Sequence, residues 1–371
     1  MSTSRFQVVT DIHLVENLSA ELNAILGAGE YALIVSRSAA ANPSLGPVVK
    51  AFAPSAKVLV SPVESEPSVQ WLESRLQDFR GSTLDHIVAM GGGSCIDAAK
   101  VFAAAHAHRS ATSLTELAHK ERVATGFTPK IVAIPTTAGT GSEATSFATV
   151  WDRSSRKKIS VEYASLTPSH ALLTPSALFS LPNAVAAPPL LDAMSHALES
   201  LWNSDASEFS EAHACAALRN IFNHGPTFLR GARDTVTLRK IQLAATHSGI
   251  AIQQTRTSIA HAVSYALTLN WGVPHGHACS FLLPAIWNYV VACDPSRYMT
   301  LSAVLGHSSV EETESRVREM LRVGQTQSAL RVAGVSEGDI RFDEVQQYSR
   351  SQNFSEPISS NLLSQWVKEC L

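Results

Sequence analysis

Two short apolar runs that lead directly into glycine-rich stretches constrain the fold of this chain more than any other feature. Residues 86–90 run into GGGSCIDAAK, and residues 130–134 run into PTTAGTGSEAT. Similar runs at 31–35 and 57–60 precede them, and patterns typical of helices lie between the runs. Short buried strands that alternate with helices predict a parallel sheet covered on both faces. We therefore expect an α/β fold in the first half of the chain.

The glycine-rich stretches follow the carboxyl ends of these runs, where parallel sheets bind ligands. Gly92 and Gly93 carry no Cβ, so their backbone could approach phosphate oxygens, and a helix opening at Ser94 would offer unpaired N–H groups. Neither stretch has the GxGxxG pattern, so each could instead be a plain turn. Asp97 would then be favoured only by the helix dipole and Lys100 would be solvated. Two such stretches in one sheet favour a nucleotide.

A third stretch, LDAMSHALES, places a carboxylate and an imidazole one helical turn apart. Asp192 and His196 are i and i+4, so a helix presents both on one face, and Glu199 at i+7 shares that stripe. The stretch IAHAVSYALTLNWGVPHGHA adds His261 on an apolar run and His275 just after a turn. One aspartate and three histidines form a complete ligand set for a divalent transition ion.

Structural burial is the alternative for these histidines, because the chain has fourteen and some must fall close together by chance. Two pairs on segments too apolar for the surface favour a metal site. His277 would point away from it, either supporting a ligand or lying at the surface. We expect several histidines in polar or alanine-rich company to be solvated, namely His106, His108, His119 and His307.

Composition excludes several classes of protein. The net charge of −3 argues against a nucleic-acid binder and against a polybasic membrane contact. Five cysteines without a CxxC spacing support neither a disulfide framework nor a thiolate zinc site. The first residues lack a secretory signal, and no apolar stretch is expected to reach membrane-spanning length. These features predict a soluble cytoplasmic protein, with no nucleic-acid or membrane partner.

The second half of the chain carries helical patterns and no strand runs from Asn203 onward. The patterns cover residues 212–222, 237–252, 310–321 and 362–370. Helices that pack on helices are a common scaffold for metal ligands. We place the domain boundary near Leu181 and Pro182, which gives a dinucleotide-binding domain at 1–181 and a helical metal-binding domain at 182–371.

Four motifs in this order, GGGSCIDAAK, PTTAGTGSEAT, DAMSHALE and HAxSY…GxPHGHA, resemble the iron-containing alcohol dehydrogenase family in its group III. The resemblance covers nearly the whole chain. It implies a Rossmann-like α/β N-terminal domain and an all-α C-terminal domain, the fold shared with dehydroquinate synthase. A cleft between them would hold NAD(P)H and one divalent metal, with a homodimer as the assembly. Iron follows from the resemblance alone, since the ligand types also suit Zn²⁺ and other divalent ions.

The resemblance also implies roles for individual residues. The implied metal ligands are Asp192, His196, His261 and His275. The resemblance implies that seven residues touch the cofactor: Gly92, Gly93, Ser94, Asp97, Thr136, Thr137 and Ser142. Thr140, a hydroxyl donor of the second stretch, is a further candidate.

Two departures from the family pattern matter for the chemistry. Many members carry a histidine four residues after the ligand at position 261, and this chain has Tyr265, whose hydroxyl could serve as a proton relay. Members that prefer NADH often carry Asp after the strand at 31–35, and this chain has Ser36 and Arg37. Loss of that carboxylate and gain of a cation predict that NADPH is accepted.

The substrate class also rests on resemblance. SFATVWD, DAMSHALESLWN and TRTSIAHAVSYALT resemble the branch that reduces phosphonoacetaldehyde to 2-hydroxyethylphosphonate and its neighbours that act on sulfoacetaldehyde. An anionic head group needs a cation, and Arg256 and Lys158 are the candidates. A solvated hairpin turn is the alternative for Lys158 and for Arg153 and Arg156. A general short-chain alcohol dehydrogenase, a non-redox relative of the same fold and a binding protein remain alternatives.

Overall fold

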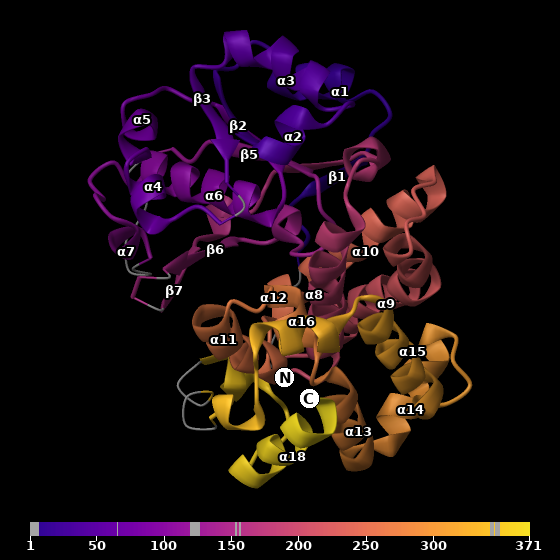
Figure 1. Ribbon diagram of the computed structural model, residues 1–371. Helices are drawn as coiled ribbons and strands as arrows, with labels where there is room; N and C mark the ends of the chain where they lie inside the picture. The colour runs from indigo at the N-terminus through magenta and orange to yellow at the C-terminus, as the bar shows by residue number, and fades with distance from the viewer. Residues whose placement is uncertain are drawn as a thin grey trace, which may run out of the picture. The chain divides into compact units, whose positions relative to one another are not determined.

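The computed structural model describes residues 7–64, 66–118, 127–152, 154–155, 157–341, 345 and 349–371. The described chain forms two compact units. An α/β unit comprises residues 7–137 and 142–181, and a helical unit comprises residues 138–141 and 182–371. Figure 1 draws the α/β unit in indigo to magenta and the helical unit mostly in orange to yellow.

The α/β unit is built on a six-stranded sheet in the order β1-β8-β5-β4-β2-β3, and every pairing in it is parallel. The strands are β1 (Asp11–Leu14), β2 (Tyr31–Ser36), β3 (Val58–Val63), β4 (His86–Gly91), β5 (Lys130–Pro135) and β8 (His170–Leu173). The predicted parallel sheet is therefore confirmed, and each of the four predicted runs is a strand. The sequence reading missed β1 and β8, which are only four residues long.

Helices cover both faces of this sheet, as expected when a strand is apolar on both sides. They are α1 (Leu18–Leu26), α2 (Arg37–Ala41), α3 (Gly46–Phe52), α4 (Val69–Glu73), α5 (Leu76–Arg80), α6 (Gly93–Ala107) and α7 (Leu114–Leu117). The helical pattern between the runs at 57–60 and 86–90 forms two short helices, α4 and α5. The Ser74 hydroxyl donates to the Trp71 carbonyl (2.8 Å) where α4 ends, a bond that competes with the helical pattern.

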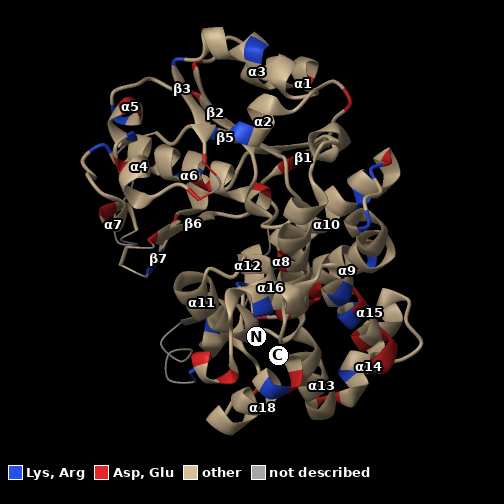
Figure 2. Ribbon diagram, in the orientation of Figure 1, with Lys and Arg blue, Asp and Glu red and all other residues tan. Residues whose placement is uncertain are grey.

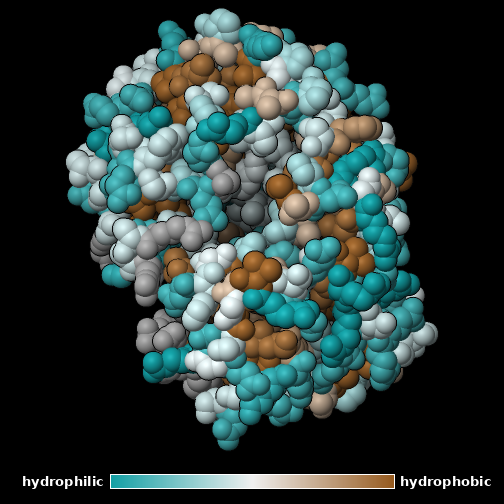
Figure 3. All heavy atoms as spheres, viewed as in Figure 1, coloured by the Kyte–Doolittle hydropathy of each residue, from teal (hydrophilic) through white to brown (hydrophobic). Residues whose placement is uncertain are grey.

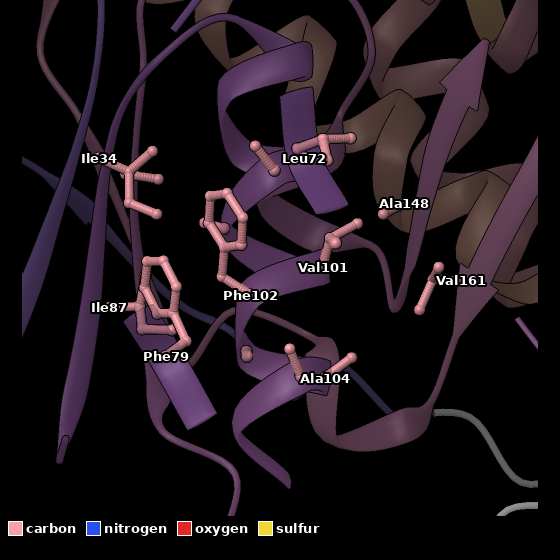
Figure 4. Packing of buried hydrophobic residues seen from close by; sticks show 14 of the residues in the cluster. Ile34, Leu72, Phe79, Ile87, Val101, Phe102, Ala104, Ala148 and Val161 are labelled. Atoms are coloured by element: carbon pink, nitrogen blue, oxygen red, sulfur yellow. The ribbon is translucent and has the colours of Figure 1, made fainter. Parts of the chain in front are cut away.

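The core of the α/β unit lies on both faces of the sheet. Ile34 and Ile87 point into one cluster, while their neighbours Leu33 and Val88 point into the other, as alternation along a strand requires. In the first cluster Phe102 of α6 stacks on Phe79 of α5 with ring centroids 4.3 Å apart (Figure 4). This packing fixes α6 against the centre of the sheet.

An antiparallel hairpin lies against the other side of α6. It consists of β6 (Phe147–Asp152) and β7 (Lys157–Glu162). Ala148 and Val161 of this hairpin belong to the same core cluster as Phe102 (Figure 4). Arg153 and Arg156 of the predicted hairpin turn lie outside the described residues.

The helical unit contains no strand in its described residues apart from an isolated bridge between Asn203 and Phe354. Its helices are α8 (Asn183–Leu201), α9 (Glu208–Leu229), α10 (Thr235–Thr255), α11 (Ile259–Trp271), α12 (His275–Ser280), α13 (Leu283–Cys293), α14 (Pro295–Leu305), α15 (Val310–Val323), α16 (Thr326–Ala333) and α18 (Ser360–Cys370). Helix α8 packs against α9, α10 and α12. The predicted helical second half is confirmed.

One apolar stretch is longer than the sequence reading allowed. His275–Cys293 is long and apolar enough to cross a membrane by composition, and 72% of that window is buried within the protein. It is split between α12 and α13, so these are core helices rather than one exposed span. On the face shown in Figure 3, hydrophilic residues cover most of the surface and apolar residues form separate patches.

Candidate active site

Helix α8 carries three buried polar residues on one face. Asp192, His196 and Glu199 are 4%, 5% and 0% exposed, and their i, i+4, i+7 spacing aligns them along the helix. Polar groups buried to this extent require partners. Those partners come from α11 and α12, which contain no Lys, Arg, Asp or Glu and are drawn entirely in tan in Figure 2.

Glu199 places the first of these partners. Its Oε1 accepts hydrogen bonds from the backbone N–H groups of Ala260 (2.6 Å) and His261 (3.2 Å) at the start of α11. These N–H groups have no acceptor within the helix, and the helix dipole favours a carboxylate there. Glu199 therefore caps α11 and holds His261 in its first turn, beside α8.

Two glycines determine the position of the second partner, His275. Helix α11 ends at Gly272 in the left-handed conformation (φ 66°, ψ 20°), and α12 begins three residues later at His275. A Cβ added at Gly276 would lie 1.7 Å from the carbonyl oxygen of Pro188 in α8. Because glycine has no Cβ, α12 can contact α8 at this point. This close contact explains why the residue directly after His275 is glycine.

The side chains of the four predicted ligands meet at one carboxylate oxygen. Asp192 Oδ1 lies 3.2 Å from His261 Nε2, 3.3 Å from His196 Nε2 and 3.8 Å from His275 Nε2. Metal–ligand bonds of about 2.1 Å separate neighbouring ligand atoms by about 3–3.5 Å. One ligand atom each from Asp192, His261, His275 and Cys279 lies within 4.8 Å of the others, and His196 lies beside this group through its 3.3 Å contact with Asp192, so an ion held by all four predicted ligands would draw them closer together. Their role as ligands stays a prediction.

Electrostatics in this cluster also favour a cation. The Nδ1 atom of His261 hydrogen-bonds Glu199 Oε2, which leaves Nε2 facing Asp192. Such carboxylate–histidine pairs orient metal ligands. Burial alone would lower the pKa of His261, but the Glu199 and Asp192 carboxylates outweigh burial and raise it to about 10. Burial would raise the pKa of Asp192, but the three histidines outweigh it and hold that pKa below its usual value. A metal ion would replace the proton that His261 otherwise holds.

Sequence reasoning missed one member of this cluster. Cys279 of α12 is fully buried, and its sulfur lies 3.6 Å from Asp192 Oδ1 and 3.4 Å from Ser195 Oγ. Burial raises the pKa of this thiol well above its usual value, so the sulfur is a neutral neighbour of the carboxylate. Its i+4 spacing from His275 is the same as that of Asp192 and His196, and this spacing could have indicated it.

Other predicted residues of the helical unit lie around this cluster rather than in it. Tyr265 is buried in α11, one turn after His261. Arg256 ends α10 with an unusual backbone (φ 66°, ψ 179°). Its carbonyl accepts from Asn203 Nδ2 (3.2 Å) and Thr255 Oγ1 (2.8 Å).

Several histidines differ from expectation. Of the two alternatives for His277, the surface position is wrong, because this histidine is buried, with Nδ1 3.2 Å from Thr326 Oγ1, and burial lowers its pKa to about 4. His106 and His108, expected to be solvated, are both 3% exposed because α6 is buried on nearly all sides. His307 is half-buried, and His119 lies outside the described residues.

The two glycine-rich stretches lie side by side in the α/β unit. The N–H of Thr136 donates to the carbonyl of Gly91 (3.0 Å), and a Cβ at Gly92 would lie 3.1 Å from Thr137 Oγ1. Helix α6 begins at Gly93, and no side chain caps its first turn. The start of a helix without a side-chain cap, together with the missing Cβ atoms, fits a phosphate.

The helix that follows contains a buried ionic network. The Lys100 ammonium is fully buried and donates to Ser142 Oγ (2.7 Å), Thr145 Oγ1 (3.0 Å) and the Phe147 carbonyl (2.9 Å). Asp97 accepts from Ser142 Oγ (2.5 Å) and from the N–H of Thr149 (2.9 Å). Burial raises the pKa of Asp97 and lowers that of Lys100 to about 8. The alternative in which Lys100 is solvated is therefore wrong.

A pocket opens beside this network. Ser94, Asp97, Thr149 and Trp151 contribute to its lining. Lys158 of β7 is near enough to Asp97 to lower the pKa of that carboxyl. The structure thus associates Lys158 with the first turns of α6, next to the predicted cofactor residues.

The remaining predicted cofactor residues fall in two places. Ser36 ends β2 and caps α2, accepting from the N–H of Ala39 (3.1 Å), and Arg37 pairs with Glu64 (2.5 Å). Thr140 lies in residues 138–141, which group with the helical unit. Next to it, a Cβ at Gly141 would lie 2.3 Å from the Cα of Gly249, so this loop packs backbone to backbone on α10.

Known proteins resemble this chain over nearly all of its length. A phosphonoacetaldehyde reductase of Streptomyces viridochromogenes is 36% identical over 217 residues, which cover 57% of this chain and 55% of that protein. The match therefore spans about half of the relative. The structure of sulfoacetaldehyde reductase from Bifidobacterium kashiwanohense in complex with NAD+ has the same fold, with a TM-score of 0.89 at 20% identity over 100% of this chain and 99% of that one.

An iron-containing alcohol dehydrogenase from Thermotoga maritima superimposes with a TM-score of 0.81 at 25% identity, covering 99% of each chain. Residues 7–175 match the model of iron-containing alcohol dehydrogenase, and residues 163–358 match the model of the C-terminal part of the Fe-containing alcohol dehydrogenase family. These two matches together span both units. The chain belongs to the iron-containing alcohol dehydrogenase family.

Proposed function

We propose that this protein uses a divalent metal ion and NAD(P)H to reduce a short aldehyde to a primary alcohol, with phosphonoacetaldehyde as the substrate. The observation that carries the proposal is the convergence of three imidazoles on Asp192, with Glu199 behind His261, in a member of this family. An ion bound there would supply a Lewis acid for the carbonyl oxygen.

The protein's own residues prepare this chemistry. Asp192 and the three histidines hold the ion, and Glu199 fixes the orientation of His261. The open first turn of α6, beside Thr136 and Thr137, receives the pyrophosphate of the cofactor. The Tyr265 hydroxyl is the candidate for returning a proton to the product.

The anionic head group of the substrate is assigned to Arg256. Its φ of 66° with an extended ψ is a region that only glycine adopts readily, and holding another residue there costs about 1–3 kcal/mol. Asn203 and Thr255 hold the carbonyl of Arg256, and three residues later α11 begins with His261 in its first turn. A strained arginine next to the helix that bears a candidate ligand supports a role in substrate binding.

The test compares KM for a charged and an uncharged aldehyde in variants of Arg256. We expect Arg256→Met to raise KM for phosphonoacetaldehyde far more than KM for propanal, because only the first carries a charge for the arginine to pair with. Arg230→Met is the matched control, since Arg230 is an exposed arginine of the same unit paired with Glu319. Equal effects of Arg256→Met on both aldehydes would remove Arg256 from the head-group site.

Sulfoacetaldehyde is the second candidate substrate. A sulfonate offers the same tetrahedral array of oxygen atoms with one charge fewer, and a structural neighbour of this chain is a sulfoacetaldehyde reductase. A panel of acetaldehyde, propanal, sulfoacetaldehyde and phosphonoacetaldehyde, assayed at 340 nm after loading with ferrous ion, ranks the candidates by kcat/KM. A kcat/KM for acetaldehyde equal to that for both anionic aldehydes would favour a general alcohol dehydrogenase.

We further propose that NADPH is accepted, with Arg37 pairing the 2′-phosphate. Glu64 now holds the Arg37 guanidinium, so the phosphate would have to compete with that carboxylate. We expect Arg37→Met to lower kcat/KM for NADPH and to leave that for NADH unchanged. A wild-type kcat/KM for NADPH below a tenth of the NADH value would contradict the proposal. The homodimer and the cytoplasmic location stay predictions.

A further inference from the structure

We propose that the α/β unit carries a second site for a divalent ion that prefers imidazole ligands, such as Zn²⁺, formed by Asp11, His13 and His170. These residues lie at the amino-terminal ends of β1 and β8, the edge of the sheet opposite to the glycine-rich stretches. The site is separate from the cluster around Asp192, and it does not depend on the proposed function.

Strand register brings the three side chains to one face. Asp11 and His13 are i and i+2 on β1, so both point to the same side of the sheet. His170 pairs with Asp11 in parallel register, which puts its side chain on that side as well. The contact therefore follows from the backbone pairing, and the side chains of these residues are 77%, 29% and 21% exposed, open to an ion from solvent.

The spacing of the ligand atoms fits a shared ion. His13 Nε2 lies 3.2 Å from His170 Nδ1, and His170 Nδ1 lies 4.0 Å from Asp11 Oδ2. One ligand atom from each residue lies within 4.8 Å of the other two. Bonds of about 2.1 Å would place neighbouring ligand atoms about 3–3.5 Å apart, so the exposed Asp11 side chain would have to move closer to the two histidines.

A carboxylate orients one of the histidines. Glu21, in the first turn of α1, lies with Oε1 2.8 Å from His13 Nδ1. A hydrogen bond there fixes the proton on Nδ1 and leaves Nε2 facing His170. This is the arrangement that Glu199 makes with His261 in the helical unit, and it is typical of metal-binding histidines. Two imidazoles with one carboxylate favour Zn²⁺, Ni²⁺ or Cu²⁺ over Mg²⁺ or Ca²⁺.

Without an ion, the same atoms would share protons. The ring nitrogens of His13 would then only hydrogen-bond Glu21 and His170, and no metal would bind. The two explanations differ in what they predict for added Zn²⁺. A bound ion would link β1, an edge strand with one neighbour, to β8 and so stabilise the folded α/β unit.

Equilibrium dialysis of the full-length protein against Zn²⁺, followed by metal analysis, tests the site. We expect two equivalents for the wild type, one for His13→Ala and for His170→Ala, and one for His261→Ala, which removes only the helical site. Glu21→Gln should weaken the second equivalent by about 10-fold or more. The control His307→Ala should keep both. A single equivalent in the wild type that the His13→Ala/His170→Ala double variant retains, or two equivalents in that double variant, would overturn the proposal.

A measurement on the unchanged protein guards against misfolded variants. Diethylpyrocarbonate modifies accessible imidazoles, and mass spectrometry locates the products. We expect Zn²⁺ to protect His13 and His170 at least tenfold, whereas Mg²⁺ at the same concentration should not. Equal modification of both residues with and without Zn²⁺ would overturn the site. Because neither experiment measures turnover, a failure here is distinct from a failure of the proposed function.

Discussion

The two units each bury a carboxylate cluster, and the clusters are neutralised differently. In the α/β unit the Lys100 ammonium supplies the positive charge next to Asp97, and all three of its N–H groups have acceptors. In the helical unit the Asp192 carboxylate lies beside three histidines and Cys279. The first cluster therefore carries its own cation. The second depends on protons or on an external cation, as a ligand site should.

The largest effect should come from His261→Ala. This change removes a ligand and leaves Glu199 without its imidazole partner, so metal retention and turnover should be lost together. Because a Lewis-acid metal contributes several kcal/mol to the barrier, we expect kcat to fall about 10³-fold or more. Metal analysis of the purified protein and the 340 nm assay provide the measurements. A variant that keeps the wild-type metal content and a normal rate would show that His261 is not a metal ligand.

Lys100→Met should instead affect stability. The change leaves the Asp97 carboxylate buried without its cation, which typically costs about 3–5 kcal/mol of unfolding free energy. Denaturant unfolding of the α/β unit measures the loss, and the metal content of the helical unit should remain that of the wild type. Loss of metal with no loss of stability would mean that the two clusters do not act independently.

The pH dependence of stability provides the control for this variant. The folded pKa of Lys100 is about 8, below the ordinary 10.5, so the unfolded chain binds more protons between these values. Stability contributed by this group should therefore rise as pH increases from about 8 to 10.5, by about 3 kcal/mol relative to Lys100→Met. A constant difference in unfolding free energy between the two proteins across that range would contradict the buried lysine.

Glu199→Gln should have the smallest effect of the three changes. Glutamine keeps an oxygen that can accept from the N–H groups of Ala260 and His261, so α11 should stay capped. The charge that orients His261 is lost, and we expect metal affinity to fall by about 10- to 100-fold. Competition with a chelator measures the affinity. The control is Glu208→Gln, at the exposed start of α9. Equal metal affinities of the two variants would show that Glu199 does not contribute to metal binding.

The sequence predicted those parts of the molecule in which local pattern and tertiary role agree. The strands β2, β4 and β5 are continuous apolar runs because both of their faces are covered, so pattern alone indicated them. Asp192 and His196 were visible because one helix carries both. Helix α10 was also found, although the unusual backbone of Arg256, the residue that follows it, was not.

The missed features depend on contacts between distant segments. Strand β1 is mostly exposed and carries Asp11 and His13, so it has no apolar run to detect. Lys100 looked solvated because its partners, residues 142–147, come from a loop about 45 positions later. Cys279 had the right spacing from His275, but nothing in the pattern placed its sulfur beside Asp192.

The contact between Gly276 and Pro188 means that the distance of His275 from Asp192 is set by the main chain. A single added methyl group would wedge α12 away from α8 and carry the His275 imidazole with it, while leaving every donor atom in the protein. Preference among ions of different radius would then change without any change of ligand. If the four predicted residues hold an ion, its selectivity could be tuned at a residue that does not touch it.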